Sequence, residues 1–101
     1  MSRLALYKNN LIDLADSYPF LLDIQNDHIQ AGTRIVALVR KSGTISDISI
    51  TTLKFSYTGG HYSASLLDLL TVSERNLGAP LAQFGHLKAA LTNAVDFIFV
   101  D

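Results

Sequence analysis

The sequence has no cysteine, so the chain can form neither a disulfide nor a thiolate metal site, and it offers no thiol nucleophile. Only packing and hydrogen bonds can hold its folded state together. This composition suits a reducing compartment, and we expect a cytoplasmic protein.

Long hydrophobic runs and basic stripes are also missing. Residues 1–6 are followed at once by the polar Lys8, Asn9 and Asn10, too early for a signal peptide, and no apolar run approaches the ~20 residues that span a membrane. The net charge is −1, and the eight lysines and arginines are scattered along the chain. The sequence therefore predicts a protein that is not membrane-bound and does not bind nucleic acid directly.

What the chain does contain is a large apolar fraction. Hydrophobic residues make up 49% and charged residues 17% of the 101 residues, which is typical of a folded domain with an apolar interior. This length suits one domain with one core. We expect residues 1–101 to form a single domain without a linker or repeat.

Most of the chain has the pattern of β-strands. Residues 3–7 alternate before the polar stretch 8–10, which predicts a first edge strand. The segment 11–18 mixes apolar and acidic residues and stops before Pro19, so we expect a loop with at most one helical turn.

The clearest local signal is a β-hairpin. Two alternating segments, 53–58 and 61–66, are separated by Gly59 and Gly60, which predicts a two-residue Gly-Gly turn because glycine accepts the positive φ angles of such turns. The residues expected to face water are Lys54, Ser56, Thr58, Ser63 and Ser65. Those expected to face the core are Leu53, Phe55, Tyr57, Tyr62, Ala64 and Leu66.

After a further apolar segment, 67–72, the period changes from two to three or four. The apolar residues Leu81, Phe84, Leu87, Leu91, Val95 and Ile98 then share one stripe, which predicts a helix from Pro80 to the end of the sequence. The expected fold is mainly β with α: a twisted antiparallel sheet, or SH3-like partial barrel, of about five to seven strands, closed by this C-terminal helix. A second helical stripe, formed by Ala90, Asn93 and Phe97, indicates a twofold homodimer.

Residues that carry chemistry are sparse. His28, His61 and His86 have no second ligand at a metal-binding spacing, so we expect no metal or other cofactor. His61, Ser63, Ser65 and Asp68 supply the types of a nucleophilic triad, but no Gly-x-Ser-x-Gly elbow accompanies them. Asp23 and Asp27 fit turn caps at a strand exit better than an acid/base pair. The sequence therefore favours a binding protein over an enzyme.

One stretch points to a family. A strand over residues 20–27 leaves through Asp-x-Gln-x-Asp, and after Gly32 the chain returns as the β-branched run 33–39. This pattern resembles the opening of the CcdB-type toxins, and the resemblance continues to the helix. The matching positions are Leu6, Tyr7, Asp23, Gln25, Asp27, Arg34, Val36, Val72, Gly78, His86, Asn93 and Ala94. It implies the toxin half of a type II toxin–antitoxin system, which poisons DNA gyrase by noncatalytic binding.

The resemblance also implies partners. They are a second copy of the chain, the C-terminal segment of a CcdA-like antitoxin, and the gyrase A subunit, met by the last turns of the helix and by the loop after the Asp-x-Gln strand. The implied contact residues are His28, Ile29, Lys88, Asn93, Asp96, Phe99, Val100 and Asp101. Each also has a simpler interpretation as a solvated, core or dimer residue.

The last residues depart from the family. CcdB-type toxins finish with a tryptophan, a glycine and an aliphatic residue. In the ending Phe99-Val100-Asp101, the resemblance places Val100 at the tryptophan and Asp101 at the glycine. Because interfaces depend on a few aromatic or arginine anchors, we expect weak or absent gyrase inhibition. Asp96 and Asp101 also put negative charge at the negative end of the helix dipole, which predicts fraying there.

Two alternatives stay open at this point. One is a MazF-type mRNA interferase with Arg34 and Thr33 in catalysis, although the Gly-Asp strand typical of that family is absent. The other is a non-toxic adaptor dimer with the same fold.

Overall fold

The computed structural model describes residues 3–11, 13–25, 32–42 and 51–99. Their strands are β1 (Ala5–Lys8), β2 (Phe20–Asp23), β3 (Thr33–Lys41), β4 (Thr52–Tyr57), β5 (Gly60–Ser73) and β6 (Ala82–Gln83). The helical elements are the 3₁₀ turns η2 (Glu74–Asn76) and η3 (Gly85–Leu87) and the α-helix α1 (Lys88–Phe99).

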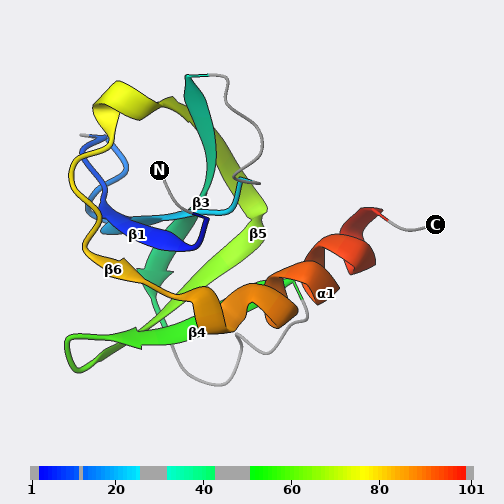
Figure 1. The fold of residues 1–101 in the computed structure, drawn as a ribbon. Coiled ribbons are helices and arrows are strands. Elements are labelled where there is room, and N and C mark those ends of the chain that lie inside the picture. Colours follow the sequence, from blue (N-terminus) through cyan, green and yellow to red (C-terminus); the bar gives the residue numbers. More distant parts are fainter. Residues whose placement is uncertain (1–2, 12, 26–31, 43–50, 100–101) are drawn as a thin grey trace.

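These strands form one six-stranded sheet in the order β4-β5-β3-β2-β1-β6. All neighbouring pairs are antiparallel. The sheet curls into a half-barrel, and α1 lies beside β4 with its C-terminal end pointing away from the strands (Figure 1). The predicted fold class is therefore confirmed.

β1 is an inner strand, and the prediction of an edge strand was wrong. It pairs with β2 on one side and with β6 on the other. The Leu81 N–H donates to the Leu6 carbonyl at 2.7 Å, and the Phe84 N–H donates to the Leu4 carbonyl at 2.9 Å. A strand of two residues is too short to show alternation in the sequence, so β6 was missed.

The same pairing corrects the start of the helix. α1 begins at Lys88, whereas the stripe predicted a start near Pro80. Residues 81–84 are held extended along β1 instead, and Leu81 is 42% exposed. Spacings of three and four over a short segment do not distinguish a helix from strand and turn, and here tertiary pairing decides. Within the described part of the chain, no helix is long and apolar enough to cross a membrane.

The predicted hairpin is formed by β4 and β5, with its turn one residue earlier than expected. Tyr57 pairs with Gly60, so Thr58 and Gly59 are the two turn residues. Their φ angles are 47° and 81°, and two consecutive positive φ angles are typical of the type I′ turn that matches strand twist. A Cβ atom at Gly60 would lie 3.0 Å from Cε2 of Tyr62, so the second glycine provides space for this ring.

The exposure predicted for the hairpin holds for most positions. Leu53, Phe55, Ala64 and Leu66 are buried, and Tyr57 and Tyr62 pack beside them. Ser63 is the exception, because it is only 2% exposed although it was expected to face water. It lies on the middle strand of three, directly opposite Arg40 of β3 and Lys54 of β4.

β5 is longer than the sequence indicated. The segments 61–66 and 67–72 form one strand of 14 residues, which pairs with both β4 and β3. Its register with β3 shifts between Ala37 and Val39, which face Leu69 and Ala64. Such irregularities increase twist and bend a strand, which explains how this sheet can curl.

The sheet has a hydrophobic cluster on each face. The larger cluster lies between the sheet and α1, and its buried members are Leu4, Leu6, Leu22, Ala37, Val39, Leu53, Phe55, Ala64, Leu66, Phe84, Leu87, Leu91 and Ala94. The smaller one consists of Ala5, Tyr7, Leu21, Val36, Val72 and Leu77. β1 contributes to both, which explains why its residues from Ala5 to Tyr7 are all buried.

Residues 13–18 form the expected loop with a helical turn. The Ala15 N–H donates to the Leu11 carbonyl at 3.0 Å, and the Tyr18 N–H donates to the Leu14 carbonyl at 2.8 Å. The buried Asn9 side chain closes this loop, because its Nδ2 donates to the Tyr18 carbonyl at 2.6 Å.

Candidate functional site

α1 is held to the sheet by one apolar side. Leu91 and Ala94 are fully buried, and Val95 and Ile98 pack partly buried against the larger cluster. These residues recur at spacings of three and four, so they share one side of the helix. Burial of each large side chain contributes about 1.5 to 3 kcal/mol, which fixes the opposite side towards solvent.

Three predicted contact residues lie on this solvent side. Lys88, Asn93 and Asp96 are all exposed. Asn93 and Asp96 are three residues apart and therefore neighbours on the helix surface, whereas Lys88 lies two turns before Asp96. The structure thus brings these three residues to one exposed side of α1.

An exposed aromatic side chain adjoins them. Phe97 is 63% exposed and follows Asn93 by one helical turn. The sequence placed Phe97 on the second helical stripe, which is expected to form the dimer. Phe99 closes α1 as its last helical residue.

Four other predicted contact residues, His28, Ile29, Val100 and Asp101, lie outside the described residues. The described strand ends on either side of residues 26–31 are joined by a backbone hydrogen bond. The Ile24 N–H donates to the Ile35 carbonyl at 3.1 Å.

A buried ion pair organises these strand ends. Arg34 Nε lies 2.8 Å from Asp23 Oδ2, and Arg34 Nη2 lies 3.0 Å from Asp23 Oδ1. The side chains are 3% and 0% exposed, so the bidentate pair is shielded from water. Two parallel charge-assisted hydrogen bonds of this kind fix the orientation of the two side chains and the distance between them.

Gln25 connects this ion pair to the backbone. Its N–H donates to Asp23 Oδ1 at 3.0 Å, and its carbonyl accepts from Arg34 Nη2 at 3.2 Å. Its side-chain Oε1 accepts from the Ile35 N–H at 2.9 Å. The Asp23 contact confirms the predicted turn cap, and the network sets the positions at which the candidate binding loop leaves β2 and enters β3.

The sequence carried a signal for this pair that was not used. Asp23 follows the buried Leu21 by two residues, and Arg34 precedes the buried Val36 by two. Residues two apart on a strand share a face. The Asp23 and Arg34 side chains are therefore expected on the same apolar face as Leu21 and Val36, which belong to the smaller cluster. A carboxylate and a guanidinium expected on one buried face are expected to pair.

The ionic contacts of Arg34 also bear on the ribonuclease alternative. Its guanidinium is 3% exposed and is bound to Asp23 and Gln25, so it is not available to an RNA phosphate. Thr33 is exposed whereas Arg34 is buried, so these two residues do not form a catalytic pair at the surface.

The triad ingredients are not arranged for catalysis. His61 Nδ1 lies 3.1 Å from Ser56 Oγ on the exposed side of the hairpin. Ser63 is buried, and Ser65 Oγ accepts from the Leu67 N–H at 3.2 Å.

Among the described residues, His, Asp and Glu side chains form no group of three that could hold a metal ion. His86 packs edge-on against Phe84 with ring centroids 5.8 Å apart.

The described residues form a curled antiparallel sheet with one C-terminal helix, and this architecture defines a small domain of the partial-barrel class. The chain belongs to the CcdB family, because the model of that family, described as CcdB protein, matches residues 3–100. This family comprises the toxin components of toxin–antitoxin systems, and the chain is one of them. No curated protein matches the sequence.

Proposed function

We propose that this toxin acts by noncatalytic binding to the A subunit of DNA gyrase in the cytoplasm, with the solvent side of α1 as its contact surface. The family match over residues 3–100 carries this proposal. The exposure of Lys88, Asn93 and Asp96 on one side of α1 supports the choice of surface. The buried position of Arg34 favours this activity over RNA cleavage.

A supercoiling assay with purified gyrase and relaxed plasmid tests this function. We expect the protein to inhibit supercoiling only weakly, because the tryptophan anchor of the family is missing. Replacement of the exposed Asn93 by alanine (Asn93→Ala) should raise the protein concentration needed for inhibition by about five-fold, since a typical interface contact contributes about 1 kcal/mol. Lys8→Ala, at the exposed end of β1, is the matched control and should inhibit like the native protein.

Position 100 provides the second arm of this assay. Valine stands there where the resemblance places the tryptophan that contacts gyrase, so Val100→Trp should inhibit more strongly than the native protein. If neither protein inhibits gyrase while the RNA of a parallel assay is cleaved, the interferase alternative replaces this proposal. If both activities are absent, the adaptor alternative replaces it.

We also propose that an antitoxin segment covers part of the same surface. Disordered segments fold on preformed surfaces, and the solvent side of α1 with the exposed Lys88, Asn93 and Asp96 offers one. Calorimetry with the C-terminal peptide of the antitoxin encoded next to this gene should show binding with a negative heat-capacity change, and Asn93→Ala should weaken it. Binding that leaves gyrase inhibition unchanged would show that the two surfaces are separate.

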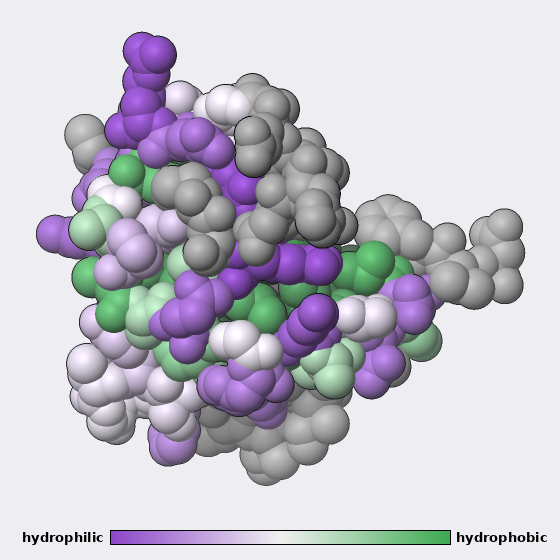
Figure 2. Space-filling model, in the orientation of Figure 1, coloured by the Kyte–Doolittle hydropathy of each residue, from purple (hydrophilic) through white to green (hydrophobic). Residues whose placement is uncertain are grey.

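The active form is proposed to be a homodimer. Ile35, Leu67, Leu69 and Phe97 are large apolar side chains that are between 39% and 69% exposed. Figure 2 shows hydrophobic surface in a band that runs towards α1 between hydrophilic side chains. Exposed apolar surface of this kind is typical of a protein interface.

A further inference from the structure

A cavity lies over the smaller hydrophobic cluster, on the other face of the sheet from α1. It has a volume of about 290 Å³ and is lined by Asn10, Leu11, Leu21, Val72, Asn76 and Leu77. Leu21, Val72 and Leu77 are buried members of the smaller cluster, whereas Asn10 and Asn76 are exposed. Aliphatic side chains therefore form the inner wall of the cavity, and two carboxamides lie at its mouth.

The backbone that carries Asn10 is held by the neighbouring side chain of Asn9, which is buried. Asn9 Oδ1 accepts from the Leu11 N–H at 2.9 Å, and Asn9 Nδ2 donates to the Tyr18 carbonyl at 2.6 Å. These two bonds fix the chain on either side of Asn10. The Asn9 amide thus stabilises the loop, whereas the Asn10 amide lines the cavity.

Asn76 is held in a similar way, as the last residue of η2. The Leu77 N–H donates to the Glu74 carbonyl at 3.1 Å, which closes this turn. The Glu74 N–H donates to the Gly32 carbonyl at 3.0 Å, which ties the turn to the residue before β3. Both amides at the cavity mouth are therefore carried by anchored backbone, and such preorganisation lowers the entropic cost of binding.

The lining of the cavity is neutral, because none of its six side chains is charged. Arg34, the cross-strand partner of Val72, is bound to Asp23 in the buried ion pair. A charged ligand would lose water here without meeting an opposite charge, which is costly. The cavity thus favours a ligand without net charge.

The volume and the lining limit the chemistry of this ligand. A cavity of about 150 Å³ holds benzene, so this one holds one ring or a short branched chain together with a small head group. The apolar lining side chains are all aliphatic, which suits an aliphatic body. A carboxamide head group both donates and accepts hydrogen bonds, as the two asparagine amides do.

We propose that this cavity binds a small neutral carboxamide with an aliphatic body. The body lies against Leu21, Val72 and Leu77, and the head group exchanges hydrogen bonds with Asn10 and Asn76. The site is on the other face of the sheet from α1 and is independent of the surface proposed for gyrase.

A titration of the full chain with cyclohexanecarboxamide, followed by backbone amide NMR, tests this proposal. We expect the amide signals of Leu21, Val72 and Leu77 to shift saturably. Cyclohexanecarboxylate has the same ring with a charged head group at pH 7, and it should bind about ten-fold more weakly.

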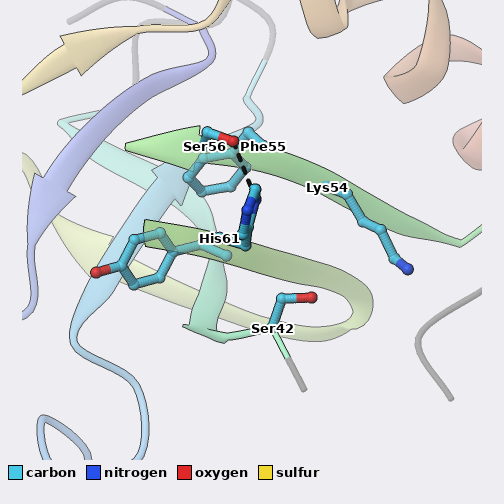
Figure 3. Close-up of a pocket in the computed structure, with 6 residues that line it drawn as sticks. Ser42, Lys54, Phe55, Ser56 and His61 are labelled. Carbon is cyan, nitrogen blue, oxygen red and sulfur yellow. Dashed lines mark hydrogen bonds between the residues drawn. The ribbon is translucent and has the colours of Figure 1, made fainter. Parts of the chain in front are cut away.

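A hollow on the hairpin provides an internal comparison in the same spectra. Lys54, Ser56 and His61 are among its lining residues, and Figure 3 shows the hydrogen bond of 3.1 Å between Ser56 Oγ and His61 Nδ1. This lining contains a cation, unlike that of the proposed site. The amide signals of Ser56 and His61 should therefore not shift with cyclohexanecarboxamide.

Asn76→Ala tests the head-group contact. Its side chain is exposed, so the substitution should leave the fold intact and weaken binding by about five-fold through the loss of one neutral hydrogen bond. Thr71→Ala is the matched control. Thr71 is exposed and precedes Val72 on β5, so its side chain is on the opposite face of the sheet, and this variant should bind like the native protein.

Three results would overturn the proposal: shifts that do not saturate, equal binding of the carboxamide and the carboxylate, or equal binding by Asn76→Ala and the native protein. Equal shifts at Ser56 and His61 would also overturn it, because they would indicate general association with the surface. None of these results depends on gyrase inhibition.

Discussion

At the scale of single residues, the Asp23–Arg34 pair is the contact with the largest expected energetic effect. Taking two charges out of water is costly, and the geometry here repays that cost through two short hydrogen bonds, with further contacts to Gln25. Such a pair contributes little net stability compared with apolar residues, but it penalises any arrangement in which one charge is buried alone. It therefore specifies where β2 ends and where β3 begins.

Removal of one partner tests this argument. Arg34→Met should lower the free energy of unfolding by about 3 to 5 kcal/mol, because it leaves the fully buried Asp23 carboxylate without its counter-charge. The double variant Asp23→Leu with Arg34→Met should lose less than the sum of the two single variants, as measured by urea denaturation. Additive losses would mean that the two side chains do not interact energetically.

At the scale of elements, α1 has an unfavourable C-terminal end. Its last turn contains Asp96 and no basic residue, although the partial negative charge of a helix C-terminus favours cations. Asp96→Asn should raise the free energy of unfolding by about 0.3 to 1 kcal/mol at low salt, and the gain should shrink at high salt.

Asp68→Asn provides the comparison for this variant. Asp68 is an exposed carboxylate within the strand β5, and its neutralisation should change thermal stability little. An equal gain for both variants would point to the net charge of the chain and not to the helix dipole.

Elements were predictable where one local rule governed them. Alternation and a turn signal located the β4–β5 hairpin to within one residue, and the apolar stripe from Leu87 to Ile98 located α1. The start of α1 was wrong because residues 81–84 pair with β1, which is remote in the sequence. Ser63 was misplaced for a similar reason, since its burial depends on the neighbouring strands and not on its own alternation.

At the scale of the whole molecule, the candidate site was only partly predictable. The solvent side of α1 follows from helical periodicity, so the exposure of Lys88, Asn93 and Asp96 could be anticipated. The Asp23–Arg34 network required the pairing of β2 with β3. This pairing is a contact between strands, which the sequence pattern does not specify.

The exposed apolar side chains Ile35, Leu67, Leu69 and Phe97 predict that the whole molecule is a dimer. In a twofold dimer each copy contributes the same patch, and Phe97, 63% exposed on α1, is its most prominent aromatic side chain. Sedimentation equilibrium should give about twice the chain mass of 11.0 kDa.

Phe97→Ser should weaken the dimer by about 30-fold, because truncation of an aromatic anchor typically costs about 2 kcal/mol of binding. It should hardly change the fold, since this side chain is mostly in solvent. Leu81→Ser removes an exposed apolar side chain outside α1, β3 and β5 and should remain dimeric. A native protein that is monomeric at micromolar concentration, or a Phe97→Ser variant that dimerises like the native chain, would contradict this assignment of the interface.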